Sequence, residues 1–341
     1  MEDLLRSTSF DPALTEGARN AVRVCLRVRA GEKVTLIADE VSLEIGAALA
    51  RELEAAGARH RDWVLENLAR RPLVRMPGEI LEDLESSQVS IFAVAAQANE
   101  LPSRMQMTEV VNRRKIRHAH MVNISKEIMC KGMRADYEQV DRLSMKILEI
   151  TRNAAQLRAS TPAGTDLTAR MNPAYKWLKT SGIIDANTWG NLPGGEVWTT
   201  PGEVDGTFVV DGVVGDYLCA KYGDLRESPL TLRIKGSRLA EAHCANKELE
   251  DEFWRYTHTD ENSDRVGEFA IGTNIGVREV IGNILQDEKI PGVHIAFGNP
   301  YGDHTGANWF SSTHIDVVGR NFDIWADGIP IMESGVFMVS V

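Results

Sequence analysis

The second half of this sequence carries residues whose side chains bind metal ions in proteins, and they lie in glycine-rich segments. His314 and Asp316 are two positions apart in "THIDVV", so in an extended chain both side chains leave the same face. His294 lies in "GVHIAFG", where strand alternation turns it away from Val293 and Ile295. The spacing therefore predicts imidazole and carboxylate groups on one surface of neighbouring strands.

Two glutamates and a tyrosine extend this set. Glu196 follows the Pro-Gly-Gly turn of "NLPGGEVWTTP", and Glu268 lies in "GEFAIGTN". Two imidazoles with three carboxylates suit zinc, cobalt or manganese. A carboxylate can bridge two cations about 3.5–4 Å apart, and such a pair can polarise a carbonyl and generate a hydroxide nucleophile. Tyr301 adds a phenolic donor able to stabilise an oxyanion. The pattern indicates a metal site with hydrolytic chemistry.

Each of these residues also has an ordinary structural explanation. His294 can be a hydrogen-bonded core histidine, and Glu196 can satisfy backbone donors at its turn. Glu268 can cap a helix that follows it, the His-x-Asp pair can lie on an edge strand, and Tyr301 can pack in a turn. A non-catalytic site that only stabilises the domain is a further alternative, in which protein would fill every ligand position.

The elements in the first half indicate a parallel sheet. Continuous apolar stretches at 31–40, 89–97 and 118–124 have the length of buried strands. Helical periodicity marks 42–60, with Gly57 as a C-terminal stop, and 136–160. Strands that alternate with helices and are apolar on both faces predict a parallel sheet covered on both sides. No GxGxxG or GxxxxGK follows a strand, so the sequence gives no support for nucleotide binding.

The pattern changes near residue 160, where short strands separated by glycine and aspartate turns begin to dominate. Two stretches interrupt them with helical periodicity, "SRLAEAHCANKELEDEFWRYT" and "NIGVREVIGNILQD". We therefore expect an α/β N-terminal domain with a parallel sheet over 1–158. A mainly β (α+β) metal-binding catalytic domain over 159–341 should follow it.

Composition limits the partners and the location. The chain has 341 residues and a net charge of -11, which disfavours nucleic acid and anionic membrane surfaces. The segment "MEDLLRSTSFDPAL" lacks the apolar core of a signal peptide, and no apolar run reaches the length of a membrane span. The four cysteines contain no CxxC pair, so we expect neither a disulfide framework nor a zinc knot. These features favour a cytoplasmic protein.

Four motifs in order carry a family resemblance. "NLPGGEVWTTP", "GEFAIGTN", "DEKIPGVHIAFG" with its downstream tyrosine, and "HID" resemble motifs of the aminopeptidase T and aminopeptidase S family of metallo-aminopeptidases. The resemblance implies a homodimer with two divalent metal ions, the active-site tyrosine at Tyr301 and a general base whose nearest match is Glu288. It also implies these metal ligands: Glu196, Glu268, His294, His314 and Asp316.

The sequence departs from that pattern in two respects. The chain is shorter than the well-known aminopeptidases, and "PYGDHTGANWFSSTHID" contains an additional His304 and Trp309. A shorter branch resembles 2,5-dihydroxypyridine dioxygenases, which use one iron(II) held by two histidines and one carboxylate. That branch would have a histidine near Glu268, unless His304 substitutes for it.

We therefore expect a metal-dependent hydrolase of the aminopeptidase type, acting on a small peptide or amide. The presence of all five residues of the dinuclear ligand set favours hydrolysis over the iron(II) dioxygenase alternative.

Overall fold

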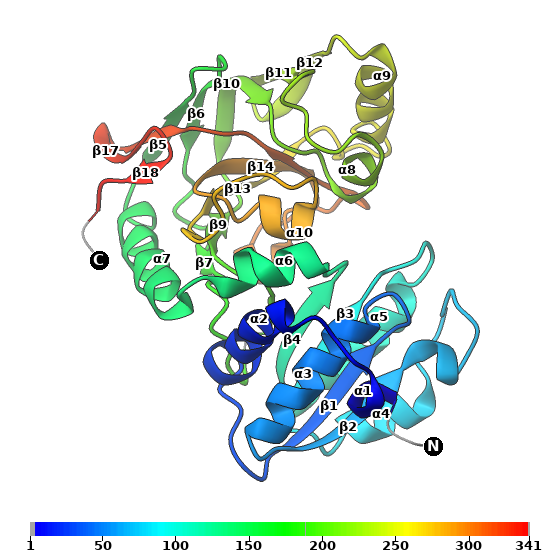
Figure 1. The fold of residues 1–341 in the computed structure, drawn as a ribbon. Coiled ribbons are helices and arrows are strands. Elements are labelled where there is room, and N and C mark those ends of the chain that lie inside the picture. The colour runs from blue at the N-terminus through cyan, green and yellow to red at the C-terminus, as the bar shows by residue number, and fades with distance from the viewer. Residues whose placement is uncertain (1–3, 188, 340–341) are drawn as a thin grey trace. The chain divides into compact units, whose positions relative to one another are not determined.

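The computed structural model describes residues 4–187 and 189–339, and the chain divides into two compact units (Figure 1). Unit 1 comprises residues 1–138 and 182–194, and unit 2 comprises residues 139–181 and 195–341. The expected fold class is confirmed, because a parallel sheet with helices is followed by mostly antiparallel sheets. The domain boundary between residues 158 and 159 stays a prediction. Residues 1–3 of the segment inspected for a signal peptide lie outside the described residues.

Unit 1 is built on a parallel sheet of five strands in the order β2-β1-β3-β4-β8. The three strands expected from the sequence are present, and 59–64 and 190–191 are additional. The strands are β1 (Lys33–Ala38), β2 (Arg59–Val64), β3 (Val89–Val94), β4 (Arg117–Val122) and β8 (Gly190–Asn191).

Helices cover both faces of this sheet (Figure 1). Helix α3 (Leu43–Ala55) packs on β1 and β2, close to Ala38. Ile37 precedes Ala38 in β1, and it packs with residues of α4 (Gly78–Leu84) and α5 (Leu101–Arg114). Consecutive residues of a strand point to opposite faces, so the two sets of helices lie on opposite sides.

Short helical segments complete unit 1. They are α1 (Leu4–Ser7), α2 (Thr15–Arg19), α6 (Lys126–Cys130), a π-helix (Asn20–Cys25) and 3₁₀ helices at Pro12–Leu14, Leu65–Asn67 and Gly132–Arg134. Helix α7 (Tyr137–Thr151) begins where this unit ends.

Unit 2 contains an eight-stranded and a five-stranded antiparallel sheet. The first has the order β12-β11-β10-β6-β5-β16-β17-β18, and the second has the order β15-β14-β13-β9-β7. Both contribute side chains to one hydrophobic core, for example Phe208 from the first and Phe297 from the second.

The eight-stranded sheet consists of β5 (Gln156–Ser160), β6 (Asp166–Arg170), β10 (Glu203–Val210), β11 (Leu230–Lys235), β12 (Arg238–His243), β16 (Asp323–Ala326), β17 (Ile329–Glu333) and β18 (Val336–Phe337). The five-stranded sheet consists of β7 (Leu178–Lys179), β9 (Glu196–Thr199), β13 (Val266–Gly272), β14 (Gly292–Gly298) and β15 (His314–Val318). The helices of unit 2 after α7 are α8 (Asp216–Tyr222), α9 (Lys247–Tyr256), α10 (Ile284–Asp287) and α11 (Gly302–Thr305).

Three helix predictions extended too far. The helix expected at 136–160 ends at Thr151, and its last part is strand β5, in which Leu157 and Ala159 alternate into the core. The stretch that begins at Ser237 forms strand β12 before helix α9. Asn246 separates the two because its side chain accepts hydrogen bonds from the first backbone N–H groups of the helix.

The third stretch, "NIGVREVIGNILQD", is helical only at Ile284–Asp287. The Asp287 carboxylate accepts hydrogen bonds from the backbone of Ile281, Gly282 and Asn283, which holds the preceding segment in a turn. Local side-chain bonds of this kind compete with helix formation.

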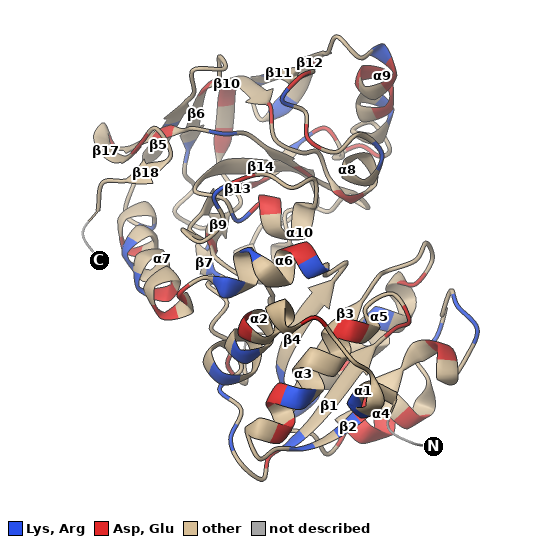
Figure 2. Ribbon diagram, viewed as in Figure 1, with Lys and Arg blue, Asp and Glu red and all other residues tan. Residues whose placement is uncertain are grey.

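Acidic and basic residues are interleaved along both units, as helix α9 illustrates (Figure 2). Within residues 4–187 and 189–339, no helix has the length and apolar character needed to cross a bilayer.

Candidate metal centre

The strand register of the five-stranded sheet places the predicted ligands on one face. Glu268 is opposite Ala296, and Ala296 is opposite Asp316. His294 is opposite Ala270, and His314 is opposite Gly298. The strand that begins with Glu196 pairs with β13 so that Glu196 is opposite Gly272. Residues paired across an antiparallel ladder project to the same side.

The opposite face of this sheet packs into the core. The residues between the predicted ligands are Val197, Phe269, Ile271, Val293, Ile295, Ile315 and Val317, all buried. On the ligand face, the residues between the charged side chains are small, since they include Ala270 and Ala296. Small neighbours leave space above the sheet for the long glutamate and histidine side chains.

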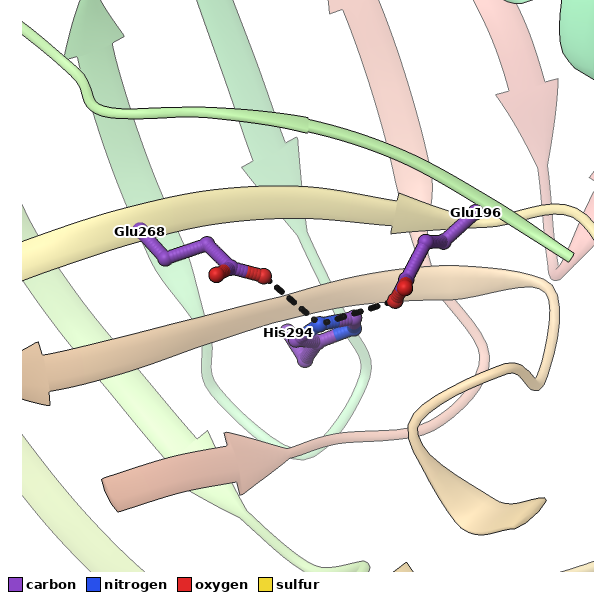
Figure 3. A group of neighbouring side chains, drawn as sticks. All are labelled: Glu196, Glu268 and His294. Atoms are coloured by element: carbon purple, nitrogen blue, oxygen red, sulfur yellow. Dashed lines mark ion pairs between the residues drawn. The ribbon is translucent and has the colours of Figure 1, made fainter. Parts of the chain in front are cut away.

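The side chains approach one another at distances that suit a shared cation. His294 Nε2 lies 3.4 Å from Glu268 Oε1 and 3.6 Å from Glu196 Oε2, and both glutamates reach towards the ring in Figure 3. His314 Nε2 lies 3.4 Å from Asp316 Oδ1 and 3.7 Å from Glu268 Oε2. Two donors that are each about 2.1 Å from a tetrahedral cation are about 3.4 Å apart. The donor set and its spacing therefore fit a divalent metal ion.

Three overlapping groups have ligand atoms within 4.8 Å of one another. They are Glu196–Glu268–His294, Glu268–His314–Asp316 and Glu288–His294–Asp316. The structure thus brings together all five residues that the family resemblance implies, and adds Glu288. That they bind metal stays a prediction.

His314 is oriented for ligation by its second ring nitrogen. Its Nδ1 lies 3.0 Å from the carbonyl oxygen of Asn299, which can only accept a hydrogen bond. Nδ1 therefore carries a proton, and Nε2 faces Glu268 and Asp316, whose negative charges raise the pKa of His314 and would equally attract a cation to this nitrogen. A hydrogen bond of this type fixes the tautomer and ring orientation of metal-binding histidines.

The electrostatics of the centre favour positive charge. Burial lowers the pKa of His294, but Glu268 and Glu196 outweigh this effect and raise that pKa to about 8. Burial raises the pKa of Asp316, but His314 and its other cationic neighbours hold it at about 2. The raised pKa of His294 reports the negative potential of the carboxylates around it, and the lowered pKa of Asp316 keeps that carboxyl group ionised.

A buried lysine lies inside this cluster, and sequence reasoning did not identify it. Lys289 Nζ is 2.7 Å from Glu196 Oε1 and also pairs with Glu288. Burial raises the pKa of Glu288 to about 8, although the Lys289 charge opposes that shift. Glu196 also accepts a hydrogen bond of 2.6 Å from Thr180 Oγ1. Nothing in "DEKIPG" distinguishes Lys289 from a solvated lysine, since only the tertiary fold buries it.

Tyr301 lies at the edge of the centre. Its ring centroid is 4.6 Å from that of His314 and 6.0 Å from that of Trp198. Its backbone is left-handed with φ 48, and its N–H donates to Asn299 Oδ1. The residue is 41% exposed, so Tyr301 lies between the imidazole and solvent.

His304 lies in helix α11 and is exposed. It belongs to none of the three candidate metal groups found among the described residues. Its substitution for a histidine near Glu268, which the dioxygenase alternative requires, gains no support from this placement.

Comparison with known proteins agrees with this arrangement. Residues 134–327 match the family model described as thermophilic metalloprotease (M29). That segment includes all the predicted ligands and Tyr301. A search of curated protein sequences gave no significant match.

Two solved structures share the fold over nearly the whole chain. AmpT from Thermus thermophilus is 19% identical with a TM-score of 0.70, over 97% of this chain and 100% of that chain. A 2,5-dihydroxypyridine dioxygenase from Pseudomonas putida KT2440 is 16% identical with a TM-score of 0.68, over 96% of this chain and 97% of that chain. Identities this low establish a common fold and leave activity open.

The family match confirms the resemblance drawn from the four sequence motifs, and it implies divalent metal ions and peptide substrates. Because the matching segment covers more than half of the chain, the chain belongs to the thermophilic metalloprotease (M29) family.

Proposed function

We propose that this chain is a metal-dependent hydrolase of the aminopeptidase type, which cleaves an N-terminal peptide bond or a small amide. The observation that carries the proposal is that two imidazoles and three carboxylates converge on one face of the five-stranded sheet. They come from four strands, β9, β13, β14 and β15. The chemistry that a divalent cation supplies in such a site is polarisation of the scissile carbonyl and activation of water.

The residues of the chain then have distinct tasks. Asn299 holds the ring of His314 so that Nε2 faces the carboxylates. Tyr301, beside that ring, donates a hydrogen bond to the oxygen that becomes negative in the transition state. Glu288 accepts a proton from the attacking water and delivers it to the leaving amine, and Lys289 fixes its carboxylate. The surplus of carboxylates attracts the free ammonium group of a substrate N-terminus.

A panel of substrates tests the proposal. Aminoacyl p-nitroanilides and dipeptides should be hydrolysed, and matched N-acetylated compounds should not. A chelator should abolish turnover, and zinc, cobalt or manganese should restore it. Equal cleavage of the acetylated compounds would contradict recognition of the N-terminus. An absence of hydrolysis across the whole panel with metal present would contradict the hydrolase assignment.

An iron(II) dioxygenase is the second candidate, because one specific arrangement favours it. Glu268 lies between His294 and His314, at 3.4 and 3.7 Å from their Nε2 atoms. Two histidines and one carboxylate are the ligand set of many mononuclear iron oxygenases. Oxygen uptake with dihydroxypyridine rings by anaerobically loaded iron(II) protein would support this candidate, and its absence alongside amide hydrolysis would exclude it.

The expected assembly and location belong to the same proposal. We propose a cytoplasmic homodimer that uses zinc, cobalt or manganese. Light scattering at several protein concentrations tests the dimer. The family resemblance implies two ions per chain, and the buried Lys289 bears directly on that number.

A further inference from the structure

Lys289 is a cation that the chain itself places inside the metal centre. Its side chain is 1% exposed, and its ammonium lies 2.7 Å from Glu196 and pairs with Glu288. Lysine is almost never fully buried unless it is paired, because removing its charge from water is costly. Both of its carboxylate partners belong to the candidate metal groups. The ammonium therefore occupies space that a metal ion would need, and it neutralises carboxylates that a metal ion would otherwise bind.

The backbone fixes the lysine in this place. The segment at Lys289 and Ile290 crosses directly over the end of β13, where a Cβ on Gly272 would meet the Ile290 carbonyl oxygen at 2.0 Å. The Lys289 carbonyl oxygen also accepts a hydrogen bond from Asn274 N–H. Only glycine at 272 allows so close an approach. The position of Lys289 thus follows from backbone packing as well as from attraction to the carboxylates.

Lys289 limits the number of cations that the centre can hold. Its ammonium already pairs with two of the four carboxylates, Glu196 and Glu288, and the other two, Glu268 and Asp316, each lie beside a histidine. A second divalent ion would have to take Glu196 or Glu288 from the lysine. It would also bring three cationic groups into one buried cluster, which is costly.

The groups also differ in whether the lysine touches them. In the described part of the chain, the ion pairs of Lys289 are with Glu196 and Glu288. The group Glu268–His314–Asp316 shares neither of these residues. His294 lies between the two sides, 3.4 Å from Glu268 and 3.6 Å from Glu196.

We propose that the Lys289 ammonium takes the place of a second cation, so that the centre binds one divalent ion, at Glu268, His314 and Asp316. In this arrangement Glu196 is primarily the partner of Lys289. The inference rests on the proposed function insofar as both place metal at the same residues. It revises the two ions that the family resemblance implies.

Metal stoichiometry tests the inference without relying on activity. The full-length chain is dialysed against zinc and analysed by plasma mass spectrometry, and is separately titrated with manganese(II) and followed by electron paramagnetic resonance. We expect one ion per chain and a signal of isolated manganese. Two ions per chain, or the signal of an exchange-coupled pair, would overturn the inference.

A lysine substitution sharpens the test. Lys289→Met keeps much of the side-chain volume and removes the charge, so a folded variant should bind two ions per chain. Lys221→Met is the matched control, because Lys221 also lies between two glutamates, Glu248 and Glu252, but on exposed helices. The control should retain one ion. A folded Lys289→Met protein that still binds one ion would overturn the role given to Lys289.

Glu196→Gln provides a second route if Lys289→Met does not fold. The variant should keep one ion with an affinity within about threefold of the parent chain, since Glu196 serves mainly the lysine. Loss of that ion would overturn the inference. Two ions with amide hydrolysis would overturn the inference and leave the proposed function standing. One ion with oxygen uptake and no hydrolysis would overturn the proposed function and leave the inference standing.

Discussion

Each unit of this chain contains a buried cluster of carboxylates, and the two clusters are balanced differently. In unit 1, Arg71 is 3% exposed at its side chain and lies 2.6 Å from Asp39, 2.5 Å from Glu100 and 3.2 Å from Glu66. It also donates to the backbone carbonyl of Ala95. Its planar guanidinium supplies several donors in fixed directions, so one residue satisfies all three carboxylates.

The cluster in unit 2 contains more acceptors than its own cation can satisfy. Lys289 pairs with Glu196 and Glu288, whereas Glu268 and Asp316 face imidazole nitrogens at 3.4–3.7 Å. Those distances exceed good hydrogen bonds and suit a shared ion. The comparison teaches that a buried acidic cluster is structural when the chain provides its donors, and points to a bound cation when it does not.

Removal of a predicted ligand should have the largest effect, because it tests directly whether the cluster in unit 2 binds a cation. His314→Ala and Asp316→Ala should each lose the metal ion and reduce turnover to background while circular dichroism remains unchanged. The physical reason is that each removes a donor from the group that Lys289 does not neutralise. Metal content per chain and amide hydrolysis are the measurements.

His243→Ala is the matched control, because His243 is an exposed histidine on β12 that pairs with Glu241. It should keep metal and activity. Full metal content and turnover in either ligand variant would remove the His-x-Asp pair from the centre.

Tyr301→Phe should have the next largest effect. Loss of one donor to an oxyanion typically reduces turnover by about a hundred- to a thousandfold, and the metal content should not change. Steady-state kinetics with metal analysis measure both. Tyr222→Phe, which removes a surface hydroxyl bonded to Glu252, is the control. A Tyr301→Phe rate equal to that of the control would leave Tyr301 with a packing role only.

Arg71→Met probes the balanced cluster of unit 1. Removing the single cation leaves buried carboxylates without a partner, which costs about 3 kcal/mol of unfolding free energy. Metal content should remain that of the parent chain, because the substitution lies in the other unit. Urea unfolding and metal analysis test the two statements. Loss of metal with stability intact would contradict the separation of the two clusters.

Glu100→Gln gives the smallest effect, and one that depends on pH. Burial alone would raise the pKa of Glu100. The hydrogen bonds from Arg71 and from the backbone N–H groups of Leu73 and Gln97 outweigh burial and lower this pKa from 4.5 to about 2. The ionised form therefore stabilises the fold, fully above about pH 4.5, and the stabilisation is lost as pH falls through about 2. We expect the variant to be about 2 kcal/mol less stable at neutral pH.

Denaturant unfolding of both proteins between pH 2 and pH 7 measures this difference, with Glu79→Gln on the exposed side of α4 as the control. A difference that stays constant on acidification would show that the Glu100 charge does not contribute.

The sequence predicted those parts of the fold and site that depend on local periodicity. The strand with His314 and Asp316 was predicted from alternation, and the buried strands of unit 1 from their apolar runs. Helix lengths were overestimated where a side chain such as Asn246 or Asp287 bonds the nearby backbone. The assignment of five residues as ligands remains a prediction, although the register brings them together.

What the sequence could not supply are relations between distant segments. Lys289 is buried only because its segment crosses β13 at Gly272. The Thr180 hydroxyl reaches Glu196, and the carbonyl of Asn299 reaches His314, through contacts that no short motif encodes. The partners that orient a site come from the tertiary fold, whereas the site's charged residues can be recognised one motif at a time.

The alanines between the predicted ligands have a consequence for sequence divergence. Ala270 and Ala296 are fully buried and stand opposite His294, Glu268 and Asp316 on the ligand face. A valine or leucine at either position would fill the volume where the charged side chains converge. A descendant of this chain could thus lose its centre with every acidic and imidazole residue still in place. Retention of those residues is a weaker guide to retained chemistry than the absence of bulk beside them.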